Sequence, residues 1–341
     1  MRTVLVTGGA GFIAHQVVAY LLANTDWMIV CLDRLDYSGN LNRLDDVLRA
    51  VTPDQRSRVK MIWHDLKAEV SPFTAKLIGT EITDVLHLAA GSHVDRSIEY
   101  PMEFVMDNVV GTGHLLQWAR TLPALRRLIY FSTDEIFGPA PAGIAYKEYD
   151  RYNSTNPYSA SKAGGEELAV AFRNTYHMPI IVTHTMNVFG ERQHPEKFIP
   201  LCIRRISTGE KIYIHANAEK TQAGSRHYIH ASDVADGLYF LLTQPDHRLV
   251  GEGAATCPKY NLVGPEEWNN LELARTIAEI QGKPLNCELV DFHSSRPGHD
   301  LRYALNGDRL KELGWVPAER MSTRLTQVVE WFLAHPEWLR V

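Results

Sequence analysis

The sequence predicts a doubly wound α/β fold, in which a parallel sheet carries helices on both faces and a smaller C-terminal α/β lobe follows. Short β-rich runs alternate with longer amphipathic segments through the first half of the chain. A glycine-rich turn follows the first run, and the pattern becomes irregular after residue 187. Regular alternation of strands and helices is typical of parallel strands joined by right-handed crossovers.

Six apolar runs of strand length are expected to form the sheet. They lie at residues 3–6, 27–32, 59–63, 84–88, 127–132 and 180–184. Helical patterns are expected at residues 12–22, 103–119 and 158–176. Because six units repeat the alternation, we expect residues 1–186 to form one dinucleotide-binding domain of the Rossmann type.

The remainder of the chain is expected to close over the carboxyl ends of the strands, where ligands of open α/β sheets bind. It contains Pro195, Pro200 and a polar run at 217–225, followed by helical patterns at 269–281 and 321–333. We expect a return segment at about 228–262 to rejoin the first domain. Residues 187–227 and 263–341 are then the smaller, substrate-binding lobe.

The bulk composition excludes several classes of protein. With 341 residues, 45% hydrophobic and 22% charged, the chain can bury a sizeable core. A net charge of −5 without a basic stripe disfavours nucleic-acid binding. No run approaches the roughly 20 apolar residues that span a bilayer. Four scattered cysteines predict no metal site and suit a reducing compartment, so we expect a cytoplasmic protein.

The turn after the first strand has the residues of a dinucleotide-binding loop. Gly8 allows a tight turn, and Gly11 lets backbone N–H groups approach a pyrophosphate at the helix end that Phe12 and Ile13 begin. A carboxylate at Asp33, after the second strand, can bind ribose hydroxyls and repel a 2′-phosphate. The adjacent Arg34 could instead accept that phosphate, so both cofactors stay open, with NAD favoured over NADP.

Two further strand ends complete the expected cofactor site. Asp65 and Leu66 follow the third strand, where a carboxylate can reach the adenine amino group. The fourth strand ends in Leu88, Ala89 and Ala90, whose small side chains would let the backbone pass close to the pyrophosphate.

Tyr158 and Lys162 are four residues apart at the start of a helical pattern and so share one face. An ammonium near the tyrosine would stabilise the phenolate and lower its pKa toward neutrality. The tyrosine could then take a proton from a sugar hydroxyl while hydride leaves the same carbon. A surface helix with an unrelated tyrosine and lysine is the alternative for this spacing alone.

Thr133, Asp134 and Glu135 stand at the carboxyl end of the fifth strand. Adjacent acids repel one another, so one can stay protonated while its neighbour ionises, which provides an acid and a base in one site. A helix N-terminus also favours acids. That alternative does not explain their coincidence with the glycine loop and with Tyr158 and Lys162.

These residues sit in longer motifs that span nearly the whole chain. The chain resembles the extended short-chain dehydrogenases/reductases and, within them, the dTDP-glucose 4,6-dehydratases. The matching segments are residues 7–13, 35–41, 87–97, 108–112, 132–138, 157–165, 195–200, 296–300 with 303–304, and 313–315. The acid pair and the segment from Arg296 to His299 are specific to this branch, whereas the glycine loop and the Tyr–Lys pair are shared by the superfamily.

The resemblance implies a three-step reaction on a nucleotide-linked hexose. Tyr158, with Lys162 and Thr133, would oxidise C4 by hydride transfer to NAD. Glu135 would remove the C5 proton, and Asp134 would protonate the departing C6 hydroxyl. The reduced cofactor would return hydride to C6, which gives a 4-keto-6-deoxy sugar and regenerates NAD.

The resemblance also implies residues that hold the substrate. These are His93, Thr133, Asn187, Lys197, Arg226, Arg296 and His299. Three departures lie near the expected nucleotide or sugar: Met186 and Val188 on either side of Asn187, Tyr228 in place of tryptophan, and a lengthened segment at 216–225. They leave the base of the nucleotide open between thymine, uracil and others.

Two other functions remain in view. A nucleotide-sugar 4-epimerase uses the same tyrosine, lysine and NAD but has no need of an acid pair. A non-catalytic NAD-binding regulator would have no use for Tyr158, Lys162, Asp134 and Glu135. By resemblance, the helices at 103–119 and 158–176 are expected to form a four-helix bundle in a homodimer.

Overall fold

The computed structural model describes residues 2–250, 256–291 and 301–340. Seven parallel strands form its main sheet in the order β3-β2-β1-β4-β5-β6-β10. The strands are β1 (Thr3–Thr7), β2 (Met28–Asp33), β3 (Val59–Trp63), β4 (Asp84–His87), β5 (Arg127–Thr133), β6 (Ile180–Thr185) and β10 (Lys259–Leu262). The predicted doubly wound fold is confirmed, and the ends of the six predicted strands differ from those observed by at most one residue.

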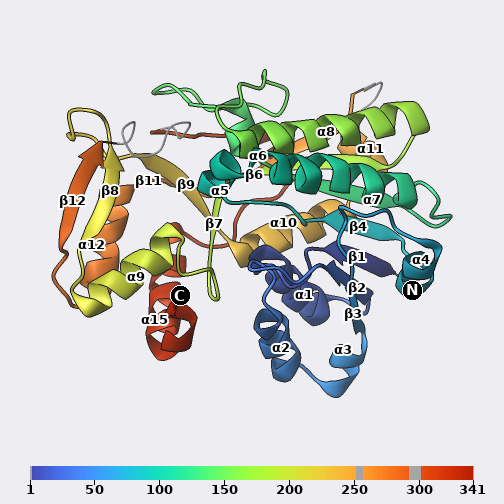
Figure 1. The fold of residues 1–341 in the computed structure, drawn as a ribbon, viewed down its shortest axis with the longest axis horizontal. Coiled ribbons are helices and arrows are strands. Elements are labelled where there is room, and N and C mark those ends of the chain that lie inside the picture. Colours follow the sequence, from blue (N-terminus) through green and yellow to red (C-terminus); the bar gives the residue numbers. More distant parts are fainter. Residues whose placement is uncertain (1, 251–255, 292–300, 341) are drawn as a thin grey trace.

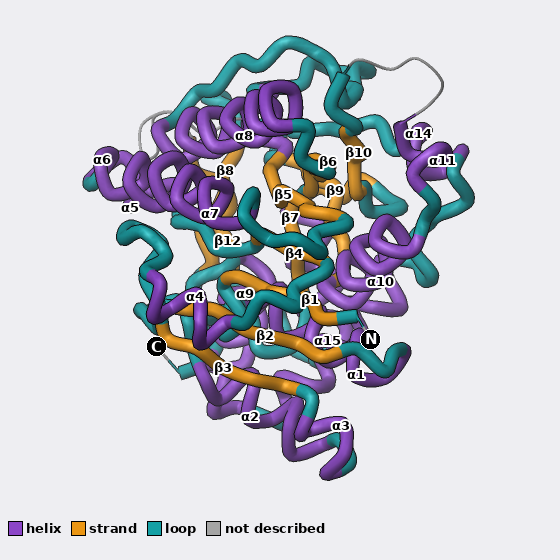
Figure 2. Tube along the Cα trace, turned by 90° about the vertical axis from the view of Figure 1, so that its right-hand side faces the viewer, coloured by secondary structure: helices purple, strands orange, loops and turns teal. Residues whose placement is uncertain are grey.

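Helices cover both faces of this sheet (Figures 1 and 2). One face carries α1 (Phe12–Asn24), α2 (Leu41–Ala50) and α10 (Ala231–Thr243), and the other carries α4 (Pro72–Ile78), α7 (Gly111–Ala119) and α8 (Pro157–Tyr176). Alternate strand residues serve the two cores: Val4 and Val6 pack in the first and Leu5 in the second. This two-sided burial explains why the strands are apolar throughout.

Shorter helices join these layers. They are α3 (Pro53–Ser57), α5 (Val94–Glu99), α6 (Pro101–Val105), α11 (Asp246–Val250) and α14 (Asp308–Glu312). The helix predicted at 103–119 is α6 and α7 joined by a π-helical turn, Met106–Val110. Within that turn, the Asn108 amide binds the backbone of Gly91 and donates to Ser161 Oγ at 2.9 Å. Such turns are frequent beside functional sites.

Helix α8 passes close to the π-helical turn that joins α6 and α7. A Cβ at Gly165 would stand 2.3 Å from the Asn108 carbonyl oxygen and 2.4 Å from Tyr130 Oη, so only glycine fits there. The middle of α8 is therefore packed directly against the backbone of that turn and against the Tyr130 hydroxyl.

The second lobe lies beside the carboxyl ends of the main strands (Figure 1). Its sheets are β11-β9-β7 and β12-β8, and its helices pack around a core of their own. The elements are β7 (Asn187–Phe189), β8 (Ile212–Ala216), β9 (Ser225–His230), β11 (Glu267–Asn269), β12 (Cys287–Asp291), α9 (Phe198–Thr208), α12 (Asn270–Ile280), α15 (Met321–Ala334) and a 3-10 turn (Pro336–Leu339).

One part of the predicted division differs in the structure. Leu310 and Trp315, which were assigned to the second lobe, pack in the core beneath the main sheet, and α14 lies against β10. The Trp315 indole donates to Asp236 on α10 at 2.7 Å, which holds this segment on the first domain. Across the described ranges, no helix is both long and apolar enough to cross a membrane.

Candidate active site

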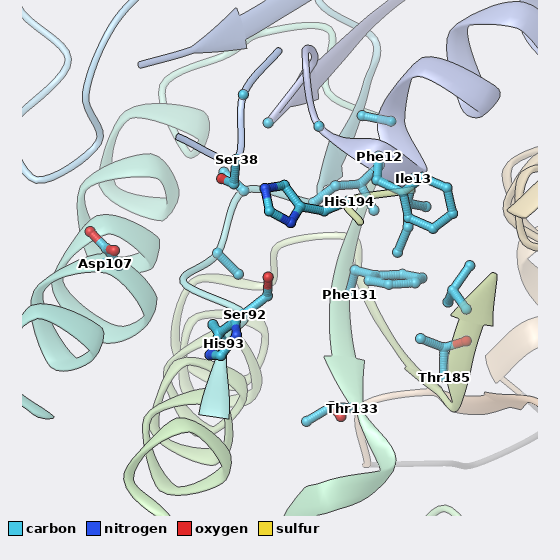
Figure 3. Close-up of a pocket in the computed structure, with 18 of the residues that line it drawn as sticks. Phe12, Ile13, Ser38, Ser92, His93, Asp107, Phe131, Thr133, Thr185 and His194 are labelled. Atoms are coloured by element: carbon cyan, nitrogen blue, oxygen red, sulfur yellow. The ribbon is translucent and has the colours of Figure 1, made fainter. Parts of the chain in front are cut away.

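A cavity lies at the carboxyl ends of β1, β2, β4, β5 and β6, with the second lobe forming part of its wall. Figure 3 shows Phe131 and Thr133 along β5, Thr185 at the end of β6, and Phe12 and Ile13 where α1 begins. The cavity is lined by all the predicted cofactor residues, namely Gly8, Gly11, Phe12, Ile13, Asp33, Arg34, Asp65, Leu66, Leu88, Ala89, Ala90, Tyr158 and Lys162.

The glycine loop is shaped for close backbone approach. Gly8 has a φ of 70°, and a Cβ there would meet the Ala89 backbone at 3.0 Å. A Cβ at Gly11 would lie 2.8 Å from the Gly8 carbonyl oxygen. The backbone of the loop therefore packs directly against other backbone, without side chains between them. Backbone N–H groups at the positive end of α1 can then face a ligand directly. This arrangement suits the pyrophosphate of a dinucleotide.

Arg34 is already engaged by carboxylates. Its guanidinium donates to Asp36 at 2.8 Å and to Asp107 at 2.9 Å. Burial opposes its charge, but Asp107 and Asp36 outweigh burial and raise the pKa of Arg34. With Asp65 at 3.8 Å and Asp33 beside it, four carboxylates surround one guanidinium, and a 2′-phosphate would be repelled. The structure thus favours NAD over NADP.

The carboxylate of Asp33 holds the loop as well as facing the cavity. It accepts the N–H groups of Ala10 at 2.9 Å and Leu35 at 2.8 Å. Burial raises the pKa of Asp33, and these two N–H groups counter part of that rise. The residue therefore joins the ends of β1 and β2 into one wall of the cavity.

Tyr158 and Lys162 project from the first turns of α8 toward β5. The phenol of Tyr158 lies beside the side chain of Thr133, which acts on its pKa. Lys162 is buried, and its ammonium donates to the Phe131 carbonyl at 2.6 Å and lies over the Tyr130 ring. Burial lowers the pKa of Lys162 to about 7. The structure thus brings together the three residues expected to oxidise a sugar hydroxyl.

The expected effect of Lys162 on Tyr158 is not observed. Burial, followed by the negative charge of Glu135, raises the pKa of Tyr158 instead of lowering it. The ammonium is directed at the Phe131 carbonyl, whereas Thr133 and the acid pair are the groups that face the phenol. The phenol is therefore protonated in the protein alone.

The two acids differ in their surroundings. Asp134 is 5% exposed, and Thr133 Oγ1 donates to its Oδ1 at 3.1 Å. Within the described part of the chain, its Oδ2 is buried without a hydrogen-bond partner. Burial and the neighbouring Glu135 raise the pKa of Asp134 to about 7, although Arg226 opposes the rise. Asp134 can therefore hold a proton near neutral pH.

Glu135 is half-buried and lies on the side of Asn156. The Asn156 amide donates to its Oε2 at 3.1 Å. Asn156 was not predicted as a site residue, although it precedes Pro157 and caps α8 by accepting the N–H of Ser159. Its position just before the predicted helix was the available signal.

The second lobe brings Asn187 and Lys197 to the cavity, opposite His93. His93 Nε2 lies 3.4 Å from the carboxylate of Glu196, a residue that sequence reasoning missed. The hydrogen bond with His93 lowers the pKa of Glu196 to about 2, against the effect of burial. The two lobes are therefore linked across the cavity.

Arg226 stands behind the lining residues. It donates to the Leu301 carbonyl at 2.6 Å, lies over the Tyr303 ring, and acts on the charge of Asp134. Arg296 and His299, the other predicted phosphate-binding residues, lie outside the described residues. In the part of the chain with described coordinates, no group of three His, Cys, Asp or Glu side chains is arranged to hold a metal ion.

The three sequence departures lie in different places. Met186, Val188 and Tyr228 line the cavity, and the Tyr228 hydroxyl donates to Asn270 at 2.9 Å. Residues 216–225 instead form a tight turn between β8 and β9 that contributes nothing to the cavity lining. The Asn217 side chain closes this turn by accepting the N–H groups of Thr221 and Gln222.

Comparison with known proteins agrees with this geometry. A model of the NAD dependent epimerase/dehydratase family matches residues 4–261. A dTDP-glucose 4,6-dehydratase from Escherichia coli is 35% identical, over 98% of this chain and 94% of the relative. A trifunctional UDP-glucose 4,6-dehydratase from Arabidopsis thaliana is 33% identical, over 99% of this chain and 48% of the relative.

A solved structure is similar over the whole chain. It is a dTDP-glucose 4,6-dehydratase from Streptomyces venezuelae with NAD bound, and it has a TM-score of 0.85 and 31% identity, with 99% of this chain and 98% of that chain covered. The chain belongs to the NAD dependent epimerase/dehydratase family.

Proposed function

We propose that this protein is an NAD-dependent 4,6-dehydratase, a hydro-lyase that converts a nucleotide-linked hexose to its 4-keto-6-deoxy form. The observation that carries the proposal is the acid pair beside Tyr158, in which Asp134 can stay protonated while Glu135 faces it. An acid and a base in one site are what an elimination of water requires. Full-length similarity to dehydratases supports it.

The cofactor is NAD, which when bound would supply the hydride acceptor for C4 and, in its reduced form, the hydride donor for C6. Gly8, Gly11 and the start of α1 would hold its pyrophosphate, and Asp33 its ribose. In the first step Tyr158 would take the C4 hydroxyl proton as its phenolate, so the phenol, which is protonated in the protein alone, must first lose its own proton to solvent. Thr133 lies beside that phenol and acts on its pKa. The Lys162 ammonium donates to the Phe131 carbonyl, one helical turn along α8 from Tyr158.

The elimination then falls to the acid pair. Once C4 is a ketone, the C5 proton is acidic, and Glu135 removes it as the electron pair forms the C5–C6 double bond. Asp134 gives its proton to the C6 hydroxyl, which leaves as water. Asn156 holds Glu135 in place by its hydrogen bond to Oε2.

The two alternatives explain less of the site. An epimerase must oxidise and re-reduce C4, which Tyr158, Lys162 and NAD suffice to do. It leaves a buried, protonated Asp134 beside Glu135 without a task, although burying that carboxyl costs stability. A non-catalytic regulator leaves the whole constellation around β5 unexplained.

The substrate proposed is a dTDP- or UDP-hexose, the two classes named for the relatives. Asn187 and Lys197 at the cavity, with Arg226 behind it, would hold the diphosphate, and His93 would lie near the sugar. Arginine suits bidentate phosphate recognition. By the sequence motif, Arg296 and His299 are proposed for the same role. Residues 1–186 with 228–262 would then be the NAD-binding domain, and the second lobe, except the segment around Leu310 and Trp315, the substrate-binding one.

We also propose that the protein is a homodimer and that it works in the cytoplasm. Ile98, Met102 and Met106 are exposed apolar side chains spaced four residues apart on α5, α6 and the turn after it. Such a row is typical of an interface between helices. The four cysteines are free thiols, as in a reducing compartment.

A substrate panel tests the proposed function. We expect dTDP-glucose or UDP-glucose to give a product lighter by one water, with solvent deuterium at C5 when the reaction is run in deuterium oxide. Mass spectrometry of the products measures both. A panel of nucleotide hexoses that yields epimers and no loss of water would overturn the dehydratase assignment.

The Asp134→Asn variant tests the protonation of the buried acid. The folded pKa of about 7 lies above the ordinary value of an aspartic acid, so wild-type stability is lost as pH rises from about 4 to about 7. Asparagine has no proton to lose. The variant should therefore exceed the wild type in free energy of unfolding by an amount that grows across this window, as denaturant titrations at several pH values would measure. If the difference in free energy of unfolding between the variant and the wild type did not change with pH, the raised pKa of Asp134 would be contradicted.

Light scattering after size-exclusion chromatography tests the dimer. We expect a species of twice the chain mass, and we expect Met102→Lys to shift it toward one chain mass because it places charge in the proposed apolar interface. A wild-type protein of one chain mass at micromolar concentration would contradict the proposal.

A further inference from the structure

A charged cluster is buried beneath the catalytic helix and contributes nothing to the cavity lining. Glu166 follows Lys162 by one helical turn on α8 and is fully buried. It meets His184 from β6, Lys259 from β10, and Tyr152 from the loop at 138–156. We call these four residues, Glu166, His184, Lys259 and Tyr152, the Glu166 cluster. None of them takes part in the proposed reaction.

The hydrogen bonds of the cluster define its charges. Glu166 accepts from Lys259 Nζ at 2.7 Å, from His184 Nε2 at 3.2 Å, and from the Tyr152 hydroxyl. Burial opposes its charge, but His184 and Lys259 outweigh burial and hold the pKa of Glu166 well below its usual range. Glu166 is therefore an ionised carboxylate shielded from solvent.

His184 lies between two side chains that can accept hydrogen bonds. Its Nε2 faces the Glu166 carboxylate, which only accepts. Its Nδ1 lies 2.9 Å from Oδ1 of Asn261, whose Nδ2 donates to the carbonyls of Tyr146 and Asn306. That orientation makes Oδ1 an acceptor toward His184. His184 and Lys259 thus both depend on one buried carboxylate.

The cluster is connected by packing to the acid pair. The rings of Tyr152 and His184 lie edge-on to Phe137 at 5.4 and 5.0 Å. Phe137 is the last residue of the 3-10 turn that begins at Asp134. Two rings of the cluster therefore pack against the turn that carries the acid pair.

The loop that Tyr152 anchors also returns to that turn. The N–H of Asn153 donates to the Ile136 carbonyl at 2.8 Å. Three residues later, the Asn156 amide donates to Glu135. These two hydrogen bonds hold both ends of the segment from Asn153 to Asn156 against the turn of the acid pair.

We propose that Glu166 is a positioning residue for the site. Through Tyr152 and His184 it anchors the loop that holds Glu135, and it keeps a compensating negative charge one helical turn from Lys162. The effect of Glu166 on catalysis rests on the proposed function. The anchoring of the loop by Glu166 rests on the contacts alone. Neither effect requires Glu166 to touch substrate or cofactor.

The charge effect has a definite sign. Glu166 raises the pKa of Lys162 against the stronger effect of burial. Loss of that carboxylate should lower the pKa of Lys162 further, so the ammonium would lose its proton at lower pH. The other titratable groups that act on the cluster are Glu167 on α8, Tyr130 on β5, and Glu148 and Cys257 in loops. All of these remain in the variants below.

Two variants separate anchoring from charge. Glu166→Gln removes the charge and replaces one of the two acceptor oxygens by an NH₂ donor, which weakens the anchor of Tyr152, whereas Tyr152→Phe removes that anchor and keeps the charge. Glu166→Asp keeps the charge if the glutamine variant fails to fold. Glu279→Gln, an exposed change of the same kind on α12, is the control, and Glu135→Gln marks complete loss of the base.

Exchange of the C5 proton measures the anchoring. We expect it to fall about tenfold or more in Glu166→Gln and Tyr152→Phe, in the direction of Glu135→Gln, because a misplaced base transfers protons poorly. Reduction of bound NAD by the sugar should fall less in Tyr152→Phe. In Glu166→Gln alone, the alkaline limb of that reduction should move to lower pH, a shift that a purely structural role would not produce.

Hydrogen exchange of the amides at 137–156 tests the anchor without any substrate. Faster exchange in Glu166→Gln and Tyr152→Phe than in Glu279→Gln is the expected result. Two results would overturn the inference. One is amide exchange in Glu166→Gln and Tyr152→Phe as slow as in the control; the other is an alkaline limb of NAD reduction in Glu166→Gln at the same pH as in Glu166→Asp, which keeps the charge. If the wild type dehydrated no sugar, the proposed function would be wrong. The amide hydrogen exchange would still test whether Glu166 anchors the loop.

Discussion

The account depends on one constraint: two adjacent carboxyl groups, Asp134 and Glu135, are placed where β5 ends against α8. Burial, followed by repulsion from Glu135, raises the pKa of Asp134, so Asp134 can hold its proton near neutral pH. Much of the surrounding structure serves this pair. Thr133 donates to Asp134 and lies beside Tyr158, and Asn156 donates to Glu135. Gly165 lets α8 pack directly against the π-helical turn at Asn108.

Electrostatics divides the cavity into two ends with different tasks. At the end of β2, carboxylates surround Arg34 and so occupy the cation that an additional phosphate would need. At the other end lie the two cations proposed to hold the diphosphate: Lys197 lines the cavity, and Arg226 stands behind the lining and acts on Asp134. Between them, the buried Lys162 donates to a backbone carbonyl, and the charge of Glu166 reaches it only from behind. Each end thus suits one of the two ligands that the reaction must bring together.

The sequence predicted what local pattern determines. Strand ends, the glycine loop and the acid pair follow from short-range periodicity and turn chemistry, and the structure gathers them around one cavity. Contacts between distant segments could not be predicted: Asp107 with Arg34, Glu196 with His93, and Trp315 with Asp236 depend on how the layers pack. The hydrogen bond from the Lys162 ammonium to the Phe131 carbonyl could not be predicted for the same reason. Sequence spacing indicates which face of a helix carries a side chain, but it does not indicate which group that side chain contacts.

The most direct test of dehydration is the fate of the hydrogen at C4. A nucleotide hexose labelled with deuterium at C4 should give a 4-keto product that carries the label in its C6 methyl group, because the hydride removed from C4 returns within the same site. Nuclear magnetic resonance of the product locates the label. Deuterium found again at C4 of an epimerised sugar would contradict the account.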